Sequence, residues 1–289
     1  MKLITIGELI DRSWEHYHAE FASLMAVSGW ILVIAAFNVA TLALYPSASR
    51  LMTANATLTG PEAAGVAMYA FSNWILGPLL GLAIFVGLIR LVRGQLSGKK
   101  TSMRAIVAET RKYFLPTLAV TAMIFGVLIA TVLIGFLPSA AISLLATYTK
   151  LGFLTVIATI ALIVGLFVSL VLGVRWSVHY YFAPFALLVD DVRGKASMTA
   201  ARKLVEGRFW GVLIRLAIPK IVFVLVGVLL MALLQFIYSV VSNAFSGLSL
   251  DVQLRIGTVF GSVLSTVVAA LLNPLIVSSD LMLYQSLKR

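Results

Sequence analysis

Long apolar runs dominate the pattern of hydrophobic and polar positions along the chain. A helix needs roughly 20 apolar residues to cross a bilayer core that is about 30 Å thick. Runs of that length lie near residues 21–45, 66–92, 115–137, 151–176, 212–245 and 256–283. Few stretches alternate as barrel strands do. The pattern therefore predicts an all-α, polytopic protein with six transmembrane helices, forming a single integral membrane domain over residues 1–289.

Amphipathic stretches precede three of these spans. In residues 1–20, Thr5 and Glu8 have the spacing of a capping box. The apolar side chains that follow the three-and-four spacing of one helix face are Leu3, Ile6, Ile10, Trp14, Tyr17 and Phe21. Similar stripes occur near 101–114 and 195–210. We expect all three stretches to form amphipathic helices at the cytoplasmic interface.

The two later stretches also resemble each other residue by residue. Lys100-Thr-Ser-Met-Arg-Ala105 aligns with Lys195-Ala-Ser-Met-Thr-Ala200, and Phe114 then aligns with Phe209. This similarity suggests a threefold repeat, in which each copy is one surface helix followed by a helical hairpin. The alternative is that each stripe is simply the pattern that any interfacial helix carries.

The distribution of basic residues predicts the orientation. In a six-span arrangement, all but three of the 22 Lys and Arg residues lie on the same side as the N-terminus. The exceptions are Arg50, Lys150 and Arg255. Because Lys and Arg accumulate in cytoplasmic loops, both termini are expected in the cytoplasm. The acidic residues after the start do not fit a cleavable signal peptide, and the short loops favour a bacterial cytoplasmic membrane.

Composition narrows the class of protein further. Hydrophobic residues make up 61% of the chain and charged residues 11%, whereas soluble domains are about a quarter charged. The net charge of +11 is therefore interpreted as a membrane feature, and no nucleic-acid partner is expected. The absence of Cys excludes disulfides, thiolate metal sites and cysteine nucleophiles. His16 and His18 are two residues apart and are expected to be surface residues without a metal.

The segment from Arg175 to Arg215 carries a more specific pattern. An Arg-containing span runs to an acidic pair and a glycine, and a further helix follows; the positions are Arg175, Asp190, Asp191, Gly194, Gly207, Arg208, Phe209 and Trp210. This pattern resembles the glycerophosphoryl diester phosphodiesterase membrane-domain family and related bacterial integral membrane proteins. That family often has Glu where this chain has the Asp pair. The resemblance implies the membrane part of such proteins.

That resemblance does not imply an enzyme. The phosphodiesterase chemistry of the family belongs to a separate barrel domain, which needs about 250 residues. The longest stretch between spans here is 177–211, so the chain has no room for the barrel. No nucleophile elbow or nucleotide loop occurs in the sequence. We therefore expect no catalytic site and no cofactor.

Ionisable residues inside or near the cytoplasmic halves of the spans are the candidate site. They are Arg175, His179, Arg215, Lys220 and Asp280. Lys220 and Asp280 are each about 12 Å below a cytoplasmic helix end on antiparallel helices, so they can meet. Arg175 is expected to face the interior if its helix continues past Trp176 towards Pro184. The cluster is interpreted either as a structural salt bridge or as a functional site.

Two functions fit these residues. The first is the binding or organisation of anionic lipid at the cytoplasmic leaflet, where Lys and Arg lie beside Trp14, Tyr113, Trp176 and Trp210. The same cations would also serve as topology signals alone. The alternative is a transporter with a polar path lined by Arg175, Lys220 and Asp280. An enzyme acting on lipid phosphates ranks last, since the sequence shows no candidate base or metal cluster. The sequence does not indicate a protein partner.

Small residues add one structural expectation. Gly77-x-x-x-Gly81 and Gly257-x-x-x-Gly261 have the spacing that lets membrane helices approach closely. Close packing inside the helix bundle is favoured over a dimer interface.

Overall fold

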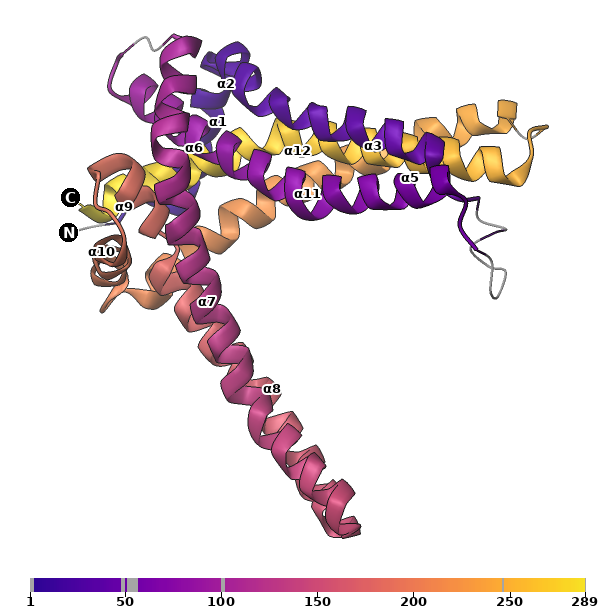
Figure 1. Ribbon diagram of the computed structural model, residues 1–289. Helices are drawn as coiled ribbons and strands as arrows, with labels where there is room; N and C mark the ends of the chain where they lie inside the picture. Colours follow the sequence, from indigo (N-terminus) through magenta and orange to yellow (C-terminus); the bar gives the residue numbers. More distant parts are fainter. Residues whose placement is uncertain (1–2, 48–49, 51–56, 100–101, 246, 289) are drawn as a thin grey trace. The chain divides into compact units, whose positions relative to one another are not determined.

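The computed structural model describes residues 3–47, 50, 57–99, 102–245 and 247–288 (Figure 1). All regular structure within these ranges is helical. Six stretches are long and apolar enough to cross a membrane: Phe21–Leu44, Gly60–Leu96, Met103–Thr149, Gly152–Asp190, Phe209–Ser242 and Leu250–Lys288. The chain is therefore an all-α, multi-pass membrane protein, as the hydropathy pattern predicts.

The helical elements are numbered as in Figure 1. In chain order they are α1 (Ile6–Ala19), α2 (Phe21–Ser28), η1 (Gly29–Ile31), α3 (Leu32–Leu44), α5 (Gly60–Phe71), the π-helix η2 (Ser72–Leu76), α6 (Gly77–Leu96), α7 (Met103–Thr149), α8 (Gly152–Tyr180), α9 (Ala183–Asp190), α10 (Lys195–Val205), α11 (Phe209–Ser242), η3 (Asn243–Phe245) and α12 (Leu250–Lys288).

The amphipathic stretch near 101–114 does not form a helix of its own. It is the first part of α7, which continues without interruption into the span predicted at 115–137. The physical reason is that no terminator separates the two parts, and Pro116 lies inside the helix without ending it. By contrast, α1 and α10 are separate helices before a helical hairpin. The threefold repeat stays a prediction.

Helix α1 begins as the sequence predicts but buries a different face. Thr5 is its N-cap, and the Thr5 hydroxyl accepts a hydrogen bond of 3.2 Å from the backbone N–H of Glu8. The buried residues are Leu9, Ser13 and Tyr17, whereas Trp14 is 44% exposed. The Ser13 hydroxyl lies 3.8 Å from the Met282 sulfur of α12. Packing against α12 selects this face, which periodicity alone does not reveal.

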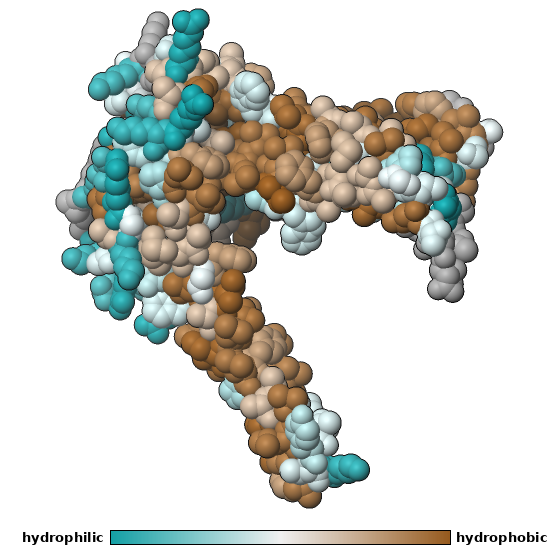
Figure 2. All heavy atoms as spheres, in the orientation of Figure 1, coloured by the Kyte–Doolittle hydropathy of each residue, from teal (hydrophilic) through white to brown (hydrophobic). Residues whose placement is uncertain are grey.

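The residues group into two compact units, and the expectation of a single domain remains a prediction. Unit 1 comprises Met1–Lys112 and Arg215–Leu287, and unit 2 comprises Tyr113–Ile214 with Lys288. Figure 2 shows apolar residues covering the outer surfaces of α3 and α5 in unit 1, and of α7 and α8 in unit 2. Ile163, Phe167 and Leu229 are each more than 60% exposed. Such exposure fits a surface whose solvent is lipid.

In unit 1, close backbone contacts hold α3, α5 and α12 together. A Cβ at Gly65 would lie 2.7 Å from the carbonyl carbon of Leu44, so glycine is needed where α5 crosses the end of α3. Arg255 on α12 donates hydrogen bonds of 2.7 Å to the carbonyls of Leu42 and Tyr45. The Leu42 carbonyl also accepts a long bond of 3.4 Å from the Tyr45 N–H. The Arg255 bonds therefore add to the hydrogen bonding at the C-terminal end of α3, where a helix runs out of intrahelical donors.

In unit 2, α7 and α8 form an antiparallel hairpin (Figure 1). The backbones approach at Gly135 and Gly165, where a Cβ on either residue would collide with the other's carbonyl group. The Ser169 hydroxyl donates a hydrogen bond of 3.2 Å to the carbonyl of Thr131. Small residues and a hydroxyl bond are the usual means of joining helices in lipid.

Candidate functional site

The five ionisable residues singled out in the sequence are divided between the two units. Arg175 and His179 lie on α8 in unit 2, whereas Arg215, Lys220 and Asp280 belong to unit 1. Each unit therefore has its own set of ionisable residues.

Lys220 and Asp280 form an ion pair, as their depths on antiparallel helices predict. The Lys220 ammonium lies 3.2 Å from a carboxylate oxygen of Asp280. The Asp280 side chain is 4% exposed and that of Lys220 27%. A carboxylate that is as deeply buried as Asp280 needs a partner of opposite charge. The pair joins α11 to α12, which favours a structural role for these two residues.

Arg215 also makes a contact that fixes a helix. Its Nε donates a hydrogen bond of 2.7 Å to the carbonyl of Ile4, just before the Thr5 N-cap of α1. Arg215 therefore ties the start of α1 to α11 within unit 1.

The expectation that Arg175 faces the interior is wrong. Helix α8 does continue past Trp176, as far as Tyr180. The helical structure is then interrupted at Tyr181 and Phe182, and α9 begins at Ala183, just before Pro184. The Arg175 side chain is nevertheless exposed. The reason is rotational: residues four apart share a helix face, and Val171, Arg175 and His179 together line a surface pocket.

His179 is held in place on both sides. Its Nδ1 donates a hydrogen bond of 2.7 Å to the carbonyl of Arg175, because a carbonyl can only accept. The imidazole stacks on Phe209 with 5.6 Å between ring centres and an angle of 27°. Phe209 is the first residue of α11. The contact therefore fixes the start of α11 against α8.

The acidic and glycine positions of the motif shape turns. Asp191 has a φ of 57° and ends α9, and Gly194 has a φ of 60° before α10. Gly207 has a φ of 75° between α10 and α11. Positive φ favours glycine, and Asp tolerates it better than most residues. Asp190 accepts a hydrogen bond of 2.6 Å from the Lys288 ammonium. Arg208 is exposed.

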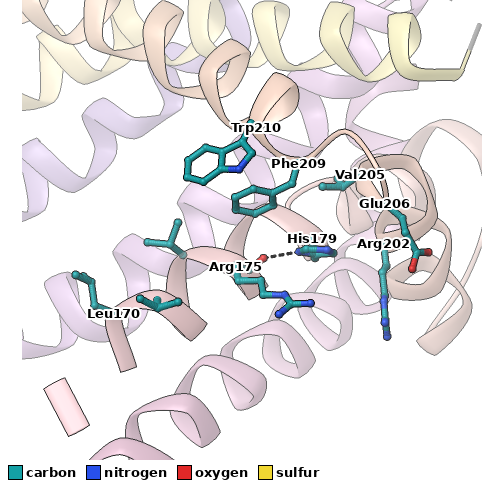
Figure 3. Close-up of a pocket in the computed structure, with 11 residues that line it drawn as sticks. Leu170, Arg175, His179, Arg202, Val205, Glu206, Phe209 and Trp210 are labelled. Carbon is teal, nitrogen blue, oxygen red and sulfur yellow. Dashed lines mark hydrogen bonds between the residues drawn. The ribbon is translucent and has the colours of Figure 1, made fainter. Parts of the chain in front are cut away.

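Two turns of the motif bring α8, α10 and the start of α11 around a pocket of about 580 Å³. Figure 3 shows Leu170 and Trp210 towards one side of it and Arg175, Arg202 and Glu206 towards the other. Trp210 is 71% exposed. The remaining lining residues are Val171, Val174, His179, Val205, Gly207 and Phe209. The pocket is therefore amphipathic, with an apolar side and a charged side.

The charged side of the pocket has an excess of positive charge. It contains the guanidinium groups of Arg175 and Arg202 and the carboxylate of Glu206. Within the described ranges, no carboxylate lies within ion-pair distance of either guanidinium. A planar guanidinium binds phosphate or carboxylate through paired hydrogen bonds. The pocket is thus suited to an amphipathic anion.

Sequence reasoning found only part of this pocket. It singled out Arg175, His179, Gly207, Phe209 and Trp210, and the structure brings these together. It missed Arg202 and Glu206, which were seen only as members of a basic amphipathic stretch. The available signal was the four-residue spacing of Arg202 and Glu206 on α10 beside its apolar stripe.

The described part of the chain offers no group of three or more His, Asp or Glu side chains that could hold a metal. What the pocket supplies is hydrogen-bond donors next to an apolar wall.

Comparison with family models, curated proteins and solved structures gives no match. The resemblance of Arg175–Arg215 to the phosphodiesterase membrane-domain family therefore stays a prediction.

Proposed function

We propose that the chain is a non-enzymatic integral membrane protein that binds anionic lipid at the cytoplasmic leaflet. The observation that carries the proposal is the amphipathic pocket of unit 2, where the guanidinium groups of Arg175 and Arg202, which have no carboxylate partner among the described residues, lie beside an apolar wall. The host membrane in this proposal is a bacterial cytoplasmic membrane with both termini in the cytoplasm, as the Lys and Arg distribution predicts.

Each part of the pocket suits one part of a lipid. A Lys or Arg near an anionic membrane surface contributes about 1 kcal/mol of attraction, and the guanidinium forks of Arg175 and Arg202 match phosphate oxygens. Leu170, Val171 and Val174 offer an apolar surface to an acyl chain. Trp210 is suited to the headgroup level, because its ring is apolar and its N–H is a donor.

The position of the two arginines separates this proposal from a topology signal. A topology signal requires only that basic residues lie in the cytoplasmic loops. It does not require them to line one pocket, as Arg175 and Arg202 do, with no carboxylate of the described ranges within ion-pair distance. The transporter alternative is less favoured, because Lys220 and Asp280 already pair with each other.

The experiment is lipid identification in native-lipid particles. Wild type is compared with Arg175→Gln and Arg202→Gln, and with Arg208→Gln as a control, since Arg208 is exposed and does not line the pocket. We expect one anionic lipid to be enriched over the bulk membrane in wild type and in the control, but not in the two pocket variants. A bulk-like lipid profile in all samples would refute the proposal.

A further inference from the structure

Unit 1 contains a second pocket of different chemistry. It has a volume of about 640 Å³ and lies between α3, the η2–α6 segment and α12. Among the described residues, its lining contains no Asp, Glu, Lys, Arg or His and carries side-chain amides and hydroxyls instead. Gly77 and Gly261, one from each small-residue motif, are part of the wall. These two glycines therefore border a cavity, and at Gly261 nothing lies within 4 Å of a Cβ position, so close helix packing does not explain that glycine.

Asn38 is the first indication that the pocket takes a ligand. The residue is 6% exposed and lines the pocket. Its Oδ1 is buried and has no hydrogen-bond partner among the described residues. Leaving a buried acceptor unpaired is unfavourable, so such a group calls for an explanation. An acceptor of this kind is available to a ligand that donates a hydrogen bond.

The π-helix η2, which also contributes to the pocket wall, is an independent indication. The backbone N–H of Gly77 bonds to the carbonyl of Ser72, five residues earlier. Pro78 has no N–H, so it cannot donate to the carbonyl of Trp74 as an α-helix requires. π-helical turns are uncommon and occur frequently at functional sites. Asn73 lies in this turn, lines the pocket, and donates its amide N–H to the carbonyl of Tyr69.

The hydrogen-bonding capacity of the walls defines the ligand. Asn73 has used an amide donor, and Thr258 and Thr266 donate their hydroxyl hydrogens to carbonyls of their own helix. The oxygens of these side chains can still accept hydrogen bonds, and the second N–H of the Asn73 amide can still donate one. A wall of amide and hydroxyl groups, with no carboxylate among its described residues, suits an uncharged ligand that donates and accepts hydrogen bonds better than a cation, whose charge would be unpaired.

We propose that this pocket binds an uncharged ligand that carries hydroxyl groups, and that these ligand hydroxyls make the contacts with the pocket. The hydroxyls donate to Asn38 Oδ1 and to the neighbouring acceptors. A membrane glyceride and a soluble polyol share this chemistry, and separate arms of the test distinguish them.

The test measures the unfolding midpoint in phosphatidylcholine nanodiscs with added ligand, since a ligand that binds only the folded state raises it. Monoolein, with two free hydroxyls, is the membrane probe, and methyl oleate is its counterpart without them. Sorbitol is the soluble probe. We expect monoolein or sorbitol to raise the midpoint by several degrees and methyl oleate to leave it unchanged. Which probe acts identifies the source of the ligand.

Two variants locate the effect. Asn38→Leu removes an unpaired acceptor, so the ligand-free midpoint should stay or rise while the ligand shift disappears. Gly261→Leu should also abolish the shift, because nothing lies within 4 Å of a Cβ there and the side chain would fill the pocket. Gly81→Leu is the matched control, since its Cβ position is equally open and outside the lining.

Polyols also stabilise folded proteins in general by exclusion from their surface, so the sorbitol shift is compared with that of Gly261→Leu. The proposal is overturned if monoolein shifts wild type no more than methyl oleate does and sorbitol shifts wild type no more than Gly261→Leu, which is the result for a cavity that holds only water. It is also overturned if the shift survives in both Asn38→Leu and Gly261→Leu.

Discussion

The Lys220 ammonium and the Asp280 carboxylate meet at 3.2 Å between α11 and α12, with Asp280 almost completely buried. The two residues are 60 positions apart in the sequence, and the contact sets the register of the two helices. Further along, Tyr238 of α11 stacks on Phe260 of α12 with 4.3 Å between ring centres. The ion pair and the stacked rings mark two points of one antiparallel seam.

The two halves of this ion pair should respond differently to mutation. Lys220→Met removes the ammonium group that pairs with a buried carboxylate, and a loss of about 3–5 kcal/mol in unfolding free energy is expected. Asp280→Asn should be milder, because Lys220 is partly exposed and can extend its amine towards the interface. Unfolding in detergent measures both variants. The double variant Lys220→Met/Asp280→Asn should be more stable than Lys220→Met alone. Equal losses of unfolding free energy in the two single variants would contradict this account.

The α7–α8 hairpin should depend on glycine at its closest point. Gly165→Ala places a methyl group against the backbone of Gly135, and overpacking of this kind destabilises by about 1–3 kcal/mol. Gly173→Ala on the same helix has open space around its Cβ, so it should be neutral or slightly stabilising. Thermal unfolding of the two variants tests this contrast. Equal midpoints would mean that the hairpin does not pack as described.

Stability should fall at mildly acidic pH because of His16. Burial lowers the pKa of His16 below its ordinary value, and neighbouring Gln95 and Glu20 oppose the shift without cancelling it. The unfolded chain, with a pKa of about 6.5, then binds the proton more readily than the folded chain does. The stabilisation is therefore present above pH 6.5 and decreases as the pH falls towards the lowered folded pKa.

Unfolding midpoints between pH 8 and pH 5 test the role of His16. His16→Gln should flatten the pH dependence, whereas His18→Gln should preserve it, since His18 is exposed. If the pH dependence of the unfolding midpoint disappears in His18→Gln and persists in His16→Gln, His16 is not its cause.

The sequence predicted the number and order of the spans because each apolar run exceeds the length that a bilayer requires. It also predicted the meeting of Lys220 and Asp280, since depth follows from residue count along an antiparallel pair. Helix rotation was harder to infer. Arg175 is exposed, and α1 buries Leu9 and Ser13, because neighbouring helices select the face that packs.

Neither pocket could be assembled in full from the sequence, for a related reason. Asn38 and Asn73 each look like an isolated polar residue in an apolar run, and only folding brings them to one cavity. Pro78 was a visible signal of an interrupted helix, but the π-helical turn at Ser72–Leu76 depends on backbone geometry. Arg202 likewise joins Arg175 only through the turns at Gly194 and Gly207.

The central claim, that an anionic lipid occupies the Arg175–Arg202 pocket, is tested most directly by fluorescence quenching of Trp210. The other tryptophans are changed to Phe, and phosphatidylglycerol or phosphatidylcholine with brominated chains is added at low fraction to nanodiscs. We predict stronger quenching by the anionic lipid, lost in Arg175→Gln/Arg202→Gln and kept in Arg208→Gln. Equal quenching by the two lipids in all three proteins would contradict the account.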